Sequence, residues 1–487
     1  DPLGAQRPYA RPEMGRNYGQ TAEAERSQIQ PRRIRLSAPS EADQWAEGVD
    51  FSDLPERFEM LEVVHAPVEL SEIDAEGRPK LVGLSPFTAS EARRYATAIL
   101  DNAGVKTGDT VGLMINAGVP EQIDAARMIY RAGFERGVRV EVMVPSETSR
   151  ERVDEMLEAD AAFISLSSFT PPGTDPFADV DGKTQNELFE FLDANSDGQF
   201  DREQVAANWA AYNAAKQANE VRWNVAVFPT RAWAQSVYPE LDPDEAYRQL
   251  GKDLRYLARC SDEDGPEAWR EHMKALRRRA HLLNEMQVEK LEISGGGTEL
   301  EVAVAEGADF LPAEWETKKG SMACVNTPTE EIFTTPDPGK ASGKIQATKP
   351  FVWYDAEAQQ TRVIEGVWAR LEDGEVVEYG CADPGQERYL DAIFNDELGT
   401  KRIGELGLVG QEARAAQLGR TYNNTIIDEN AGLHFGFGSS YADVTGGAGN
   451  EGRAHYDLSC GNDETVIHAV GKDGRREKIM ERGRWLI

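Results

Sequence analysis

The sequence predicts an α/β protein in which an N-terminal α/β domain with a parallel sheet is followed by a C-terminal α+β domain rich in strands. Three observations predict this class. Between residues 110 and 166, short apolar runs alternate with amphipathic segments in the order strand, helix, strand, which is typical of a parallel sheet covered by helices. After residue 291 the pattern changes to alternating strands separated by glycine-rich turns. The length of 487 residues is sufficient for two or three domains.

The composition excludes two classes of partner. The chain has 85 Asp and Glu against 53 Lys and Arg, which gives a formal net charge of -32. Nucleic acids and anionic membranes both need a cationic surface, so neither is expected as a partner. No apolar run approaches the about 18 residues of a membrane span. Arg greatly outnumbers Lys. Such an acidic, lysine-poor surface is typical of halophilic proteins, and an ordinary acidic enzyme is the alternative.

The cysteines indicate the compartment. Cys260, Cys324, Cys381 and Cys460 lie far apart and form no C-x-x-C pair. So few thiols in a long chain favour a reducing compartment over a disulfide scaffold, and we expect a cytoplasmic protein. Because the cysteines are so far apart, a zinc site built from them is not expected.

The N-terminal part is expected to consist of an extended arm and the beginning of an α/β domain. Residues 1–57 are rich in Arg, Pro, Gln, Ser and Glu and predict an extended arm. An α/β domain is expected over 58–287. Within it, Thr88 and Glu91 have the spacing of a capping box, which predicts a helix that ends near Gly104.

A β-α-β unit follows that helix. The expected elements are a strand over 110–115, a helix over 120–137 and strands over 138–144 and 161–166. The turn after the first of these strands, 116–120, lacks the G-x-G-x-x-G pattern. We therefore infer no dinucleotide site.

Residues 171–204 are predicted to be an insertion that contains a short helix over 186–192 and a loop resembling a calcium-binding EF-hand. Position 12 of the loop carries Gln where a bidentate Glu is expected, so the match is partial. The alternative is an acidic turn between two helices. The candidate calcium ligands are Asp193, Asn195, Asp197, Gln199, Asp201 and Gln204.

The domain boundary is placed near residue 288, so that the catalytic domain would span 288–487. Before it we expect a strand over 223–228, a helix that begins after Asp242 with Pro at its first position, and a helix over 267–285. After it, strands are expected over 299–304, 363–369 and 375–379.

Two of the six histidines lie close together in a glycine-rich stretch. His434 and His455 fall within 428–460, with Tyr441 and Asp457 beside them. In a strand, His455 and Asp457 point to the same side. Imidazole and carboxylate on one face suit Zn²⁺, Mn²⁺, Co²⁺ or Fe²⁺. An isolated H-x-D pair is more often a hydrogen-bonded surface pair, so both interpretations stay open.

Two acidic sites strengthen the metal interpretation. Glu330 and Glu331 are adjacent carboxylates after a proline turn, and Glu405 stands among small and apolar residues. A charged Glu in an apolar strand is costly unless it is paired or bound to a metal. A solvated loop for the first pair and an exposed strand edge for Glu405 are the alternatives.

These segments together resemble a known family, the aminopeptidase T-like metallo-aminopeptidases. The resemblance covers about residues 88–487. It rests on Phe228-Pro229 with Trp233-Ala234 and Val237-Tyr-Pro239, Gly297-Thr-Glu-Leu300, Pro328-Thr-Glu-Glu-Ile-Phe-Thr334, Gly404-Glu405 with Leu408, Asp428-Glu-Asn-Ala431 before His434, Tyr441, Asn450-Glu451 before His455-x-Asp457, and Arg482-Gly-Arg-Trp485. The arm and the EF-hand-like insertion depart from the usual family pattern.

The resemblance implies a two-metal exopeptidase that acts on small peptides, is a homodimer and binds two divalent ions, Zn, Co or Mn. The implied metal ligands are Glu331, Glu405, His434, His455 and Asp457, with Glu405 as the bridge. Tyr441 would be a weak ligand or a donor to the transition state. By analogy with other two-metal aminopeptidases, Glu330 is the candidate proton carrier, and Glu429 is the alternative.

Two other functions compete with this one. His434, His455 and Asp457 alone would form the 2-His-1-carboxylate site of a mononuclear non-haem iron oxygenase. A non-catalytic calcium-binding protein on the same scaffold is the third possibility. Glu331 and Glu405 favour the peptidase, because a mononuclear site does not need them.

Overall fold

The computed structural model describes residues 84–178, 180–355, 360–394 and 398–487. The arm expected over 1–57, and the first part of the domain expected from residue 58, lie outside this range. Among the described helices none is long and apolar enough to cross a membrane. The boundary expected near 288 stays a prediction.

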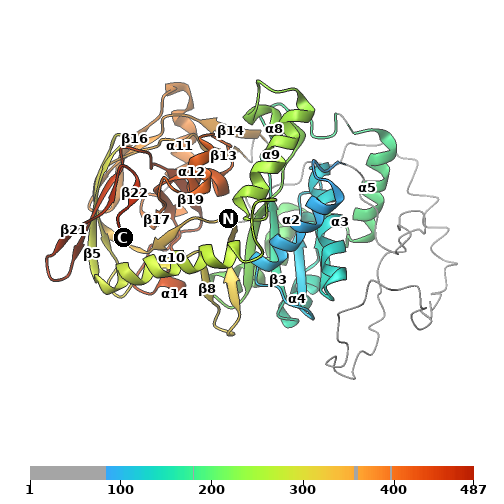
Figure 1. The fold of residues 1–487 in the computed structure, drawn as a ribbon, viewed down its shortest axis with the longest axis horizontal. Helices are drawn as coiled ribbons and strands as arrows, with labels where there is room; N and C mark the ends of the chain where they lie inside the picture. Colours follow the sequence, from blue (N-terminus) through green and yellow to red (C-terminus); the bar gives the residue numbers. More distant parts are fainter. Residues whose placement is uncertain (1–83, 179, 356–359, 395–397) are drawn as a thin grey trace. The chain divides into compact units, whose positions relative to one another are not determined.

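A parallel sheet forms the N-terminal part, as the sequence predicts (Figure 1). Its strand order is β10-β4-β3-β1-β2, and every described pair in it is parallel. The strands are β1 (Thr110–Met114), β2 (Arg139–Met143), β3 (Ala162–Ser167), β4 (Arg222–Val227) and β10 (Asn326–Thr327). The first four match the expected strands within one or two residues.

Helices cover both faces of this sheet. One face packs against α2 (Ala89–Asn102), α3 (Pro120–Glu135), α8 (Arg231–Val237) and α9 (Pro243–Leu257). The other face packs against α4 (Arg150–Glu158) and α7 (Ala210–Gln217). The capping box of Thr88 and Glu91 is present, and Asp242 accepts hydrogen bonds from the first turn of α9. Strands with apolar residues on both faces are what a doubly covered parallel sheet requires.

The insertion between β3 and β4 is helical. It contains α5 (Gly182–Ala194), α6 (Arg202–Asn208) and α7, so the EF-hand-like loop does connect two helices. In that loop Asp197 accepts a hydrogen bond from the Ser149 backbone at 3.1 Å, and Asp201 caps α6. Among the described residues, the loop contributes no group of three acidic, His or Cys ligand atoms close enough to hold an ion. Calcium binding therefore stays a prediction.

Two antiparallel sheets form the strand-rich part, on the left in Figure 1. The larger has the order β16-β15-β12-β6-β5-β20-β21-β22, and the smaller has the order β19-β18-β17-β11-β7. A shared core of buried side chains from both sheets and from α10 (Ala268–Glu285) holds them together. The strands of the larger sheet are β5 (Val288–Gly295), β6 (Thr298–Val304), β12 (Pro336–Gln346), β15 (Trp368–Glu372), β16 (Glu375–Gly380), β20 (Val466–Gly471), β21 (Arg476–Glu481) and β22 (Arg484–Trp485).

One expected strand is wrong. The segment 363–369 is not a single strand, because it falls across the end of β14 (Gln360–Ile364) and the start of β15. Gly366 lies in a bend between them with φ +64, a conformation that glycine adopts easily. β14 pairs with β13 (Phe351–Asp355) in a separate hairpin.

The smaller sheet and its connections contain most of the candidate site. Its strands are β7 (Leu311–Pro312), β11 (Ile332–Thr334), β17 (Ile403–Leu408), β18 (His434–Gly438) and β19 (His455–Ser459). The remaining described elements are the hairpin β8 (Glu314–Glu316) and β9 (Met322–Cys324), and the helices α11 (Glu387–Ile393), α12 (Arg414–Leu418), α13 (Thr425–Asp428) and α14 (Ala442–Thr445). Short 3-10 turns lie at Pro145–Glu147, Pro384–Gln386 and Glu429–Ala431.

A short connection joins the parallel sheet to the smaller antiparallel sheet. β10 pairs with β4 in the parallel sheet, and β11, which follows after four intervening residues, pairs with β17 in the smaller antiparallel sheet. The connection between them therefore passes directly from one sheet to the other. It carries Glu330 and Glu331.

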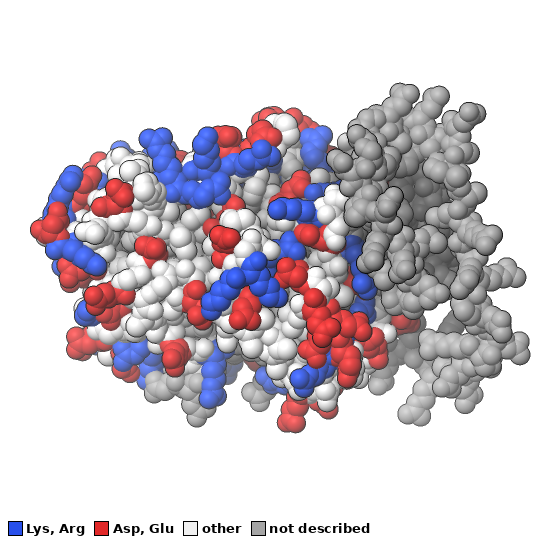
Figure 2. Space-filling model, turned by 90° about the horizontal axis from the view of Figure 1, so that it is seen from below, with Lys and Arg blue, Asp and Glu red and all other residues white. Residues whose placement is uncertain are grey.

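Charged side chains of both signs are mixed on the face shown in Figure 2. The larger sheet carries ion pairs such as Lys290 with Glu301 at 2.6 Å and Arg476 with Glu292 at 2.7 Å. All four cysteines are free thiols.

Candidate metal centre

The smaller antiparallel sheet brings together five of the predicted site residues. β17 carries Glu405, β18 begins with His434, and β19 carries His455 and Asp457. Glu331 directly precedes β11, which lies on the other side of β17. In the register, Gly436 on β18 lies opposite both Glu405 and Asp457, which places these carboxylates on one face of the sheet, on the two strands that flank β18.

The five side chains form two overlapping groups. Glu331, Glu405 and His434 make one group, and Glu405, His455 and Asp457 make the other; within each, one ligand atom per residue lies within 4.8 Å of the others. These are the two groups of this kind among the described residues. Glu405 belongs to both.

Glu405 points one oxygen at each imidazole. Its Oε1 lies 3.8 Å from Nε2 of His434, and its Oε2 lies 3.2 Å from Nε2 of His455. Glu331 Oε2 approaches His434 Nε2 at 3.0 Å, and Asp457 Oδ1 approaches His455 Nε2 at 3.1 Å. The four carboxylate–imidazole contacts thus all involve the Nε2 atoms.

The other nitrogen of each imidazole is fixed by the backbone. Nδ1 of His434 lies 3.1 Å from the carbonyl oxygen of Glu429, and Nδ1 of His455 lies 2.7 Å from that of Ser439. A carbonyl can only accept, so each Nδ1 carries the proton and donates it. With Nδ1 donating to the backbone, Nε2 of each imidazole faces the carboxylates and is the nitrogen that could bind a metal ion.

Two glycines leave room for the imidazoles. A Cβ on Gly407 would lie 2.0 Å from His434 Nε2, and a Cβ on Gly436 would lie 2.5 Å from the His455 ring. Both distances are far below any van der Waals contact. The strands can therefore approach the rings only because these positions have no side chain.

Burial and neighbouring charges shift the pKa values of the side chains in this group. Burial opposes ionisation of Glu405, but its hydrogen bonds with the two imidazoles outweigh this and lower its pKa to about 2. Burial raises the pKa of Glu331. The pKa values of His434 and His455 lie well above the usual range, because the carboxylates overcome the effect of burial. Without an ion, the group compensates for its negative charge by taking up protons.

The centre is more open on one side. The side chain of His434 is 1% exposed, whereas those of His455 and Asp457 are 20% and 16% exposed. Tyr441, at the N-terminal end of α14, packs against the His455 ring with 5.3 Å between centroids. It also contacts the rings of Trp223 and Phe333.

The donor set fits two divalent ions. Each group offers one imidazole nitrogen and two carboxylates, the imidazoles are locked in the required tautomer, and one carboxylate is shared. Carboxylate and imidazole ligands of this kind suit several transition metals, so the ligand set does not select one.

Glu330 does not join the centre. Nη2 of Arg259 lies 2.9 Å from each oxygen of its carboxylate, and the backbone N–H of Arg414 donates to the same group at 3.1 Å. Glu429 is the alternative proton carrier. Burial, and next the negative charge of Asp457, raise the pKa of Glu429 well above the usual range. Its carboxylate accepts a hydrogen bond from Asn326 at 3.1 Å.

Comparison with known proteins gives the family. The model of the thermophilic metalloprotease family, M29, matches residues 88–485.

The chain belongs to the M29 family of metalloproteases.

Members of this family with sequences similar to the chain are aminopeptidases. The chain is 34% identical to aminopeptidase T of Thermus aquaticus over 275 residues, which cover 54% of this chain and 65% of that enzyme, slightly under two thirds. It is 28% identical to aminopeptidase PepS of Streptococcus thermophilus over 82% of this chain and 99% of that enzyme. The solved structure of AmpT from Thermus thermophilus has the same fold, with a TM-score of 0.65, 24% identity, and coverage of 82% of this chain and all of that one. The chain is therefore a member of a family of metallo-aminopeptidases, and the family expected from its motifs is confirmed.

Sequence reasoning missed three residues of the site and the partner of Glu330. Gly407, Gly436 and Asn326 act through contacts that no local pattern announces. Arg259 lies 71 residues from Glu330 in the chain, and only the fold brings the two together.

Proposed function

We propose that this M29 metalloprotease is a two-metal aminopeptidase that removes N-terminal residues from small peptides. Glu331, Glu405 and His434 would hold one divalent ion, and Glu405, His455 and Asp457 would hold the second. The observation that carries the proposal is that Glu405 directs one oxygen to each imidazole. Zn²⁺, Co²⁺ and Mn²⁺ are all compatible with these ligands.

Bound ions would supply a Lewis acid for the scissile carbonyl and lower the pKa of water so that hydroxide is available at neutral pH. The chain itself must orient the peptide and move a proton. The more exposed side, at His455 and Asp457, is where a substrate would enter. Carboxylates there would attract the free α-amine of a peptide, which favours exopeptidase over endopeptidase action.

Proton transfer falls to Glu429 in this proposal. A general base must lie within reach of the reacting water, and Glu330 is engaged by Arg259 and Arg414. Glu429 is buried next to the centre, and Asn326 holds its carboxylate. Tyr441 packs on His455 and would donate a hydrogen bond to the developing oxyanion.

The test combines metal content with hydrolysis of an aminoacyl-p-nitroanilide before and after chelation. We expect two ions per chain, and cleavage that EDTA abolishes and divalent metal restores. Glu405→Gln should lose cleavage while the thermal melting curve of the apo chain remains cooperative. One iron per chain without cleavage would support the oxygenase instead, and calcium alone would support a non-catalytic protein. The homodimer and the cytoplasmic location remain part of the proposal.

A further inference from the structure

Glu330 takes part in a buried ion pair and hydrogen bonds that have no role in the proposed peptidase chemistry. Its side chain is 5% exposed and that of Arg259 is 8% exposed, with Nη2 of Arg259 2.9 Å from both carboxylate oxygens. The residue that follows is Glu331, whose side chain meets His434. Adjacent side chains of this connection thus extend to two different places, one to Arg259 and one to the metal centre.

Arg259 occupies a backbone position that normally favours glycine. It follows the C-terminal end of α9, after Ala258, and has φ +55. A left-handed residue at the end of a helix is usually Gly, because any side chain adds strain there. From this position the guanidinium group reaches the Glu330 carboxylate.

Three further residues hold the same connection. Nε2 of His272, on α10, lies 2.8 Å from the carbonyl oxygen of Thr329. The N–H of Arg414, at the start of α12, donates to Glu330, and the N–H of Glu330 donates to Asn430 at 2.6 Å. We call Arg259, His272, Arg414 and Asn430 the Glu330 anchor.

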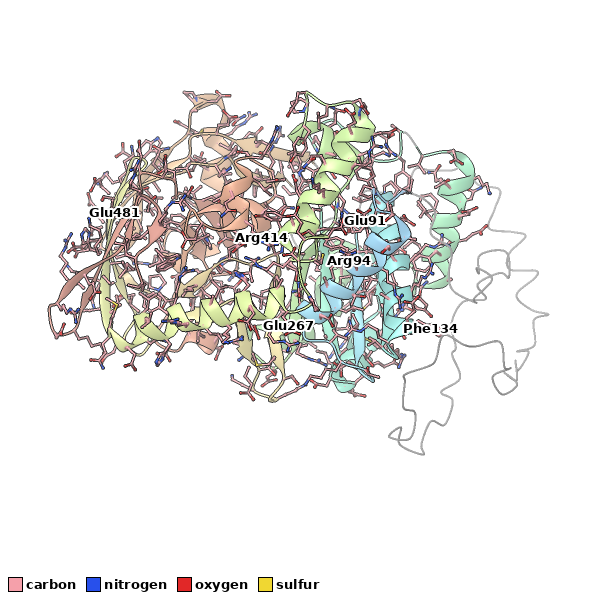
Figure 3. The ribbon with its side chains drawn as sticks, viewed as in Figure 1. Glu91, Arg94, Phe134, Glu267, Arg414 and Glu481 are labelled. Atoms are coloured by element: carbon pink, nitrogen blue, oxygen red, sulfur yellow. The ribbon has the colours of Figure 1, made fainter. Side chains whose placement is uncertain are left out.

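The anchor joins separate elements of the fold. The guanidinium of Arg414 pairs with Asp264 and lies 4.4 Å from the ring of Tyr256 near the end of α9; Figure 3 labels Arg414. Asn430 also contacts the Glu429 carboxylate at 3.4 Å. The connection that carries Glu331 is therefore fixed from α9, α10, α12 and the turn before β18.

We propose that Glu330 and Arg259 are positioning residues whose buried ion pair holds Glu331 in place to bind metal. This inference rests on the proposed function and deepens it. Removing one partner leaves the other charge buried and uncompensated, so the connection must shift to hydrate it. Outer partners that orient a metal ligand typically change metal affinity by about 10- to 100-fold.

The test is titration of the metal-free chain with Co²⁺ in competition with a chromogenic chelator. We expect Arg259→Met and Glu330→Gln each to weaken binding of one ion by about 10- to 100-fold. The double variant should bind the metal no more weakly than the single variant with the lower affinity, because the two residues act as a unit. Arg259→Lys keeps the charge and should recover part of the affinity. The kcat of Arg259→Met should recover at saturating metal.

Arg222→Met is the matched control. The side chain of Arg222, at the start of β4, is equally buried, at 8% exposed, and pairs with Asp109, just before β1, at 2.6 Å. It should lower the melting temperature without changing metal affinity. Unchanged affinity in both Arg259→Met and Glu330→Gln would overturn the positioning role, as would a Glu330→Gln variant that loses only kcat, which would make Glu330 the proton carrier. A wild-type chain that binds no pair of ions would instead refute the proposed function.

Discussion

At the scale of single residues, the geometry of the candidate metal centre depends on two glycines as much as on the five side chains that could bind metal. Gly407 and Gly436 face the two imidazoles across neighbouring strands, and a methyl group at either position would occupy the ring's own space. The carboxylates and imidazoles could be recognised from the sequence because their chemistry is informative. The glycines could not, since nothing local distinguishes them from the other glycines of the chain.

Gly407→Ala should therefore disrupt the first group of ligands. The new Cβ would lie 2.0 Å from His434 Nε2, so the ring must move and the affinity for one ion should fall by at least about tenfold. Metal titration of the apo chain measures this. Gly265→Ala is the control, because a Cβ there meets nothing within 4 Å. Equal affinity in Gly407→Ala and wild type would show that His434 does not bind metal.

Lys216 gives a pH-dependent prediction at the same scale. Its ammonium lies 3.7 Å from the centre of the Trp223 ring, and burial lowers its pKa from 10.5 to about 8. Between these two values the unfolded chain binds a proton that the native chain lacks, so the free energy of unfolding rises with pH across this window. Below pH 8 the buried charge is fully destabilising.

Lys216→Met should melt at a higher temperature than wild type at pH 7, and the difference should shrink as pH rises from about 8 to 10.5. Thermal melts across this range measure it. Lys183→Met removes a lysine that is 86% exposed and should show no such convergence. A difference that stays constant with pH would contradict the assignment.

At the scale of elements, the sequence predicts correctly those helices and strands whose signals lie within the element itself. Helices with clear caps, such as α2 and α9, and apolar strands such as β1 to β4 lie where the sequence predicts them. The strand expected over 363–369 is interrupted because Gly366 has a positive φ and bends the chain, which the apolar pattern around it does not reveal. β10 has two residues and no pattern of its own, so only its pairing with β4 reveals it.

The loop between α5 and α6 carries the calcium prediction. If the loop binds Ca²⁺, added calcium raises the melting temperature, and Asp193→Ala removes that rise. Asp181→Ala is the matched control, because Asp181 caps the other end of α5 and lies outside the loop. It should lower the melting temperature equally with and without calcium. A calcium-dependent rise that persists in Asp193→Ala would place the ion elsewhere.

At the scale of the whole molecule, the fold explains how distant residues form one site. The connection from β10 to β11 leaves the parallel sheet and enters the smaller antiparallel sheet, and it delivers Glu331 beside the strands that carry the other four side chains. The family motifs identified the chemical groups and their order along the chain. They did not show that Glu330 points to Arg259, because that contact depends on how α9 packs against this connection.

The most direct test of the central claim is the structure of the metal-loaded full chain with anomalous scattering measured at the metal absorption edges. The account predicts two peaks per chain, one next to Glu331 and His434, the other next to His455 and Asp457, with a Glu405 oxygen bound to each. A single peak, or two peaks with Glu405 bound to neither, would contradict it.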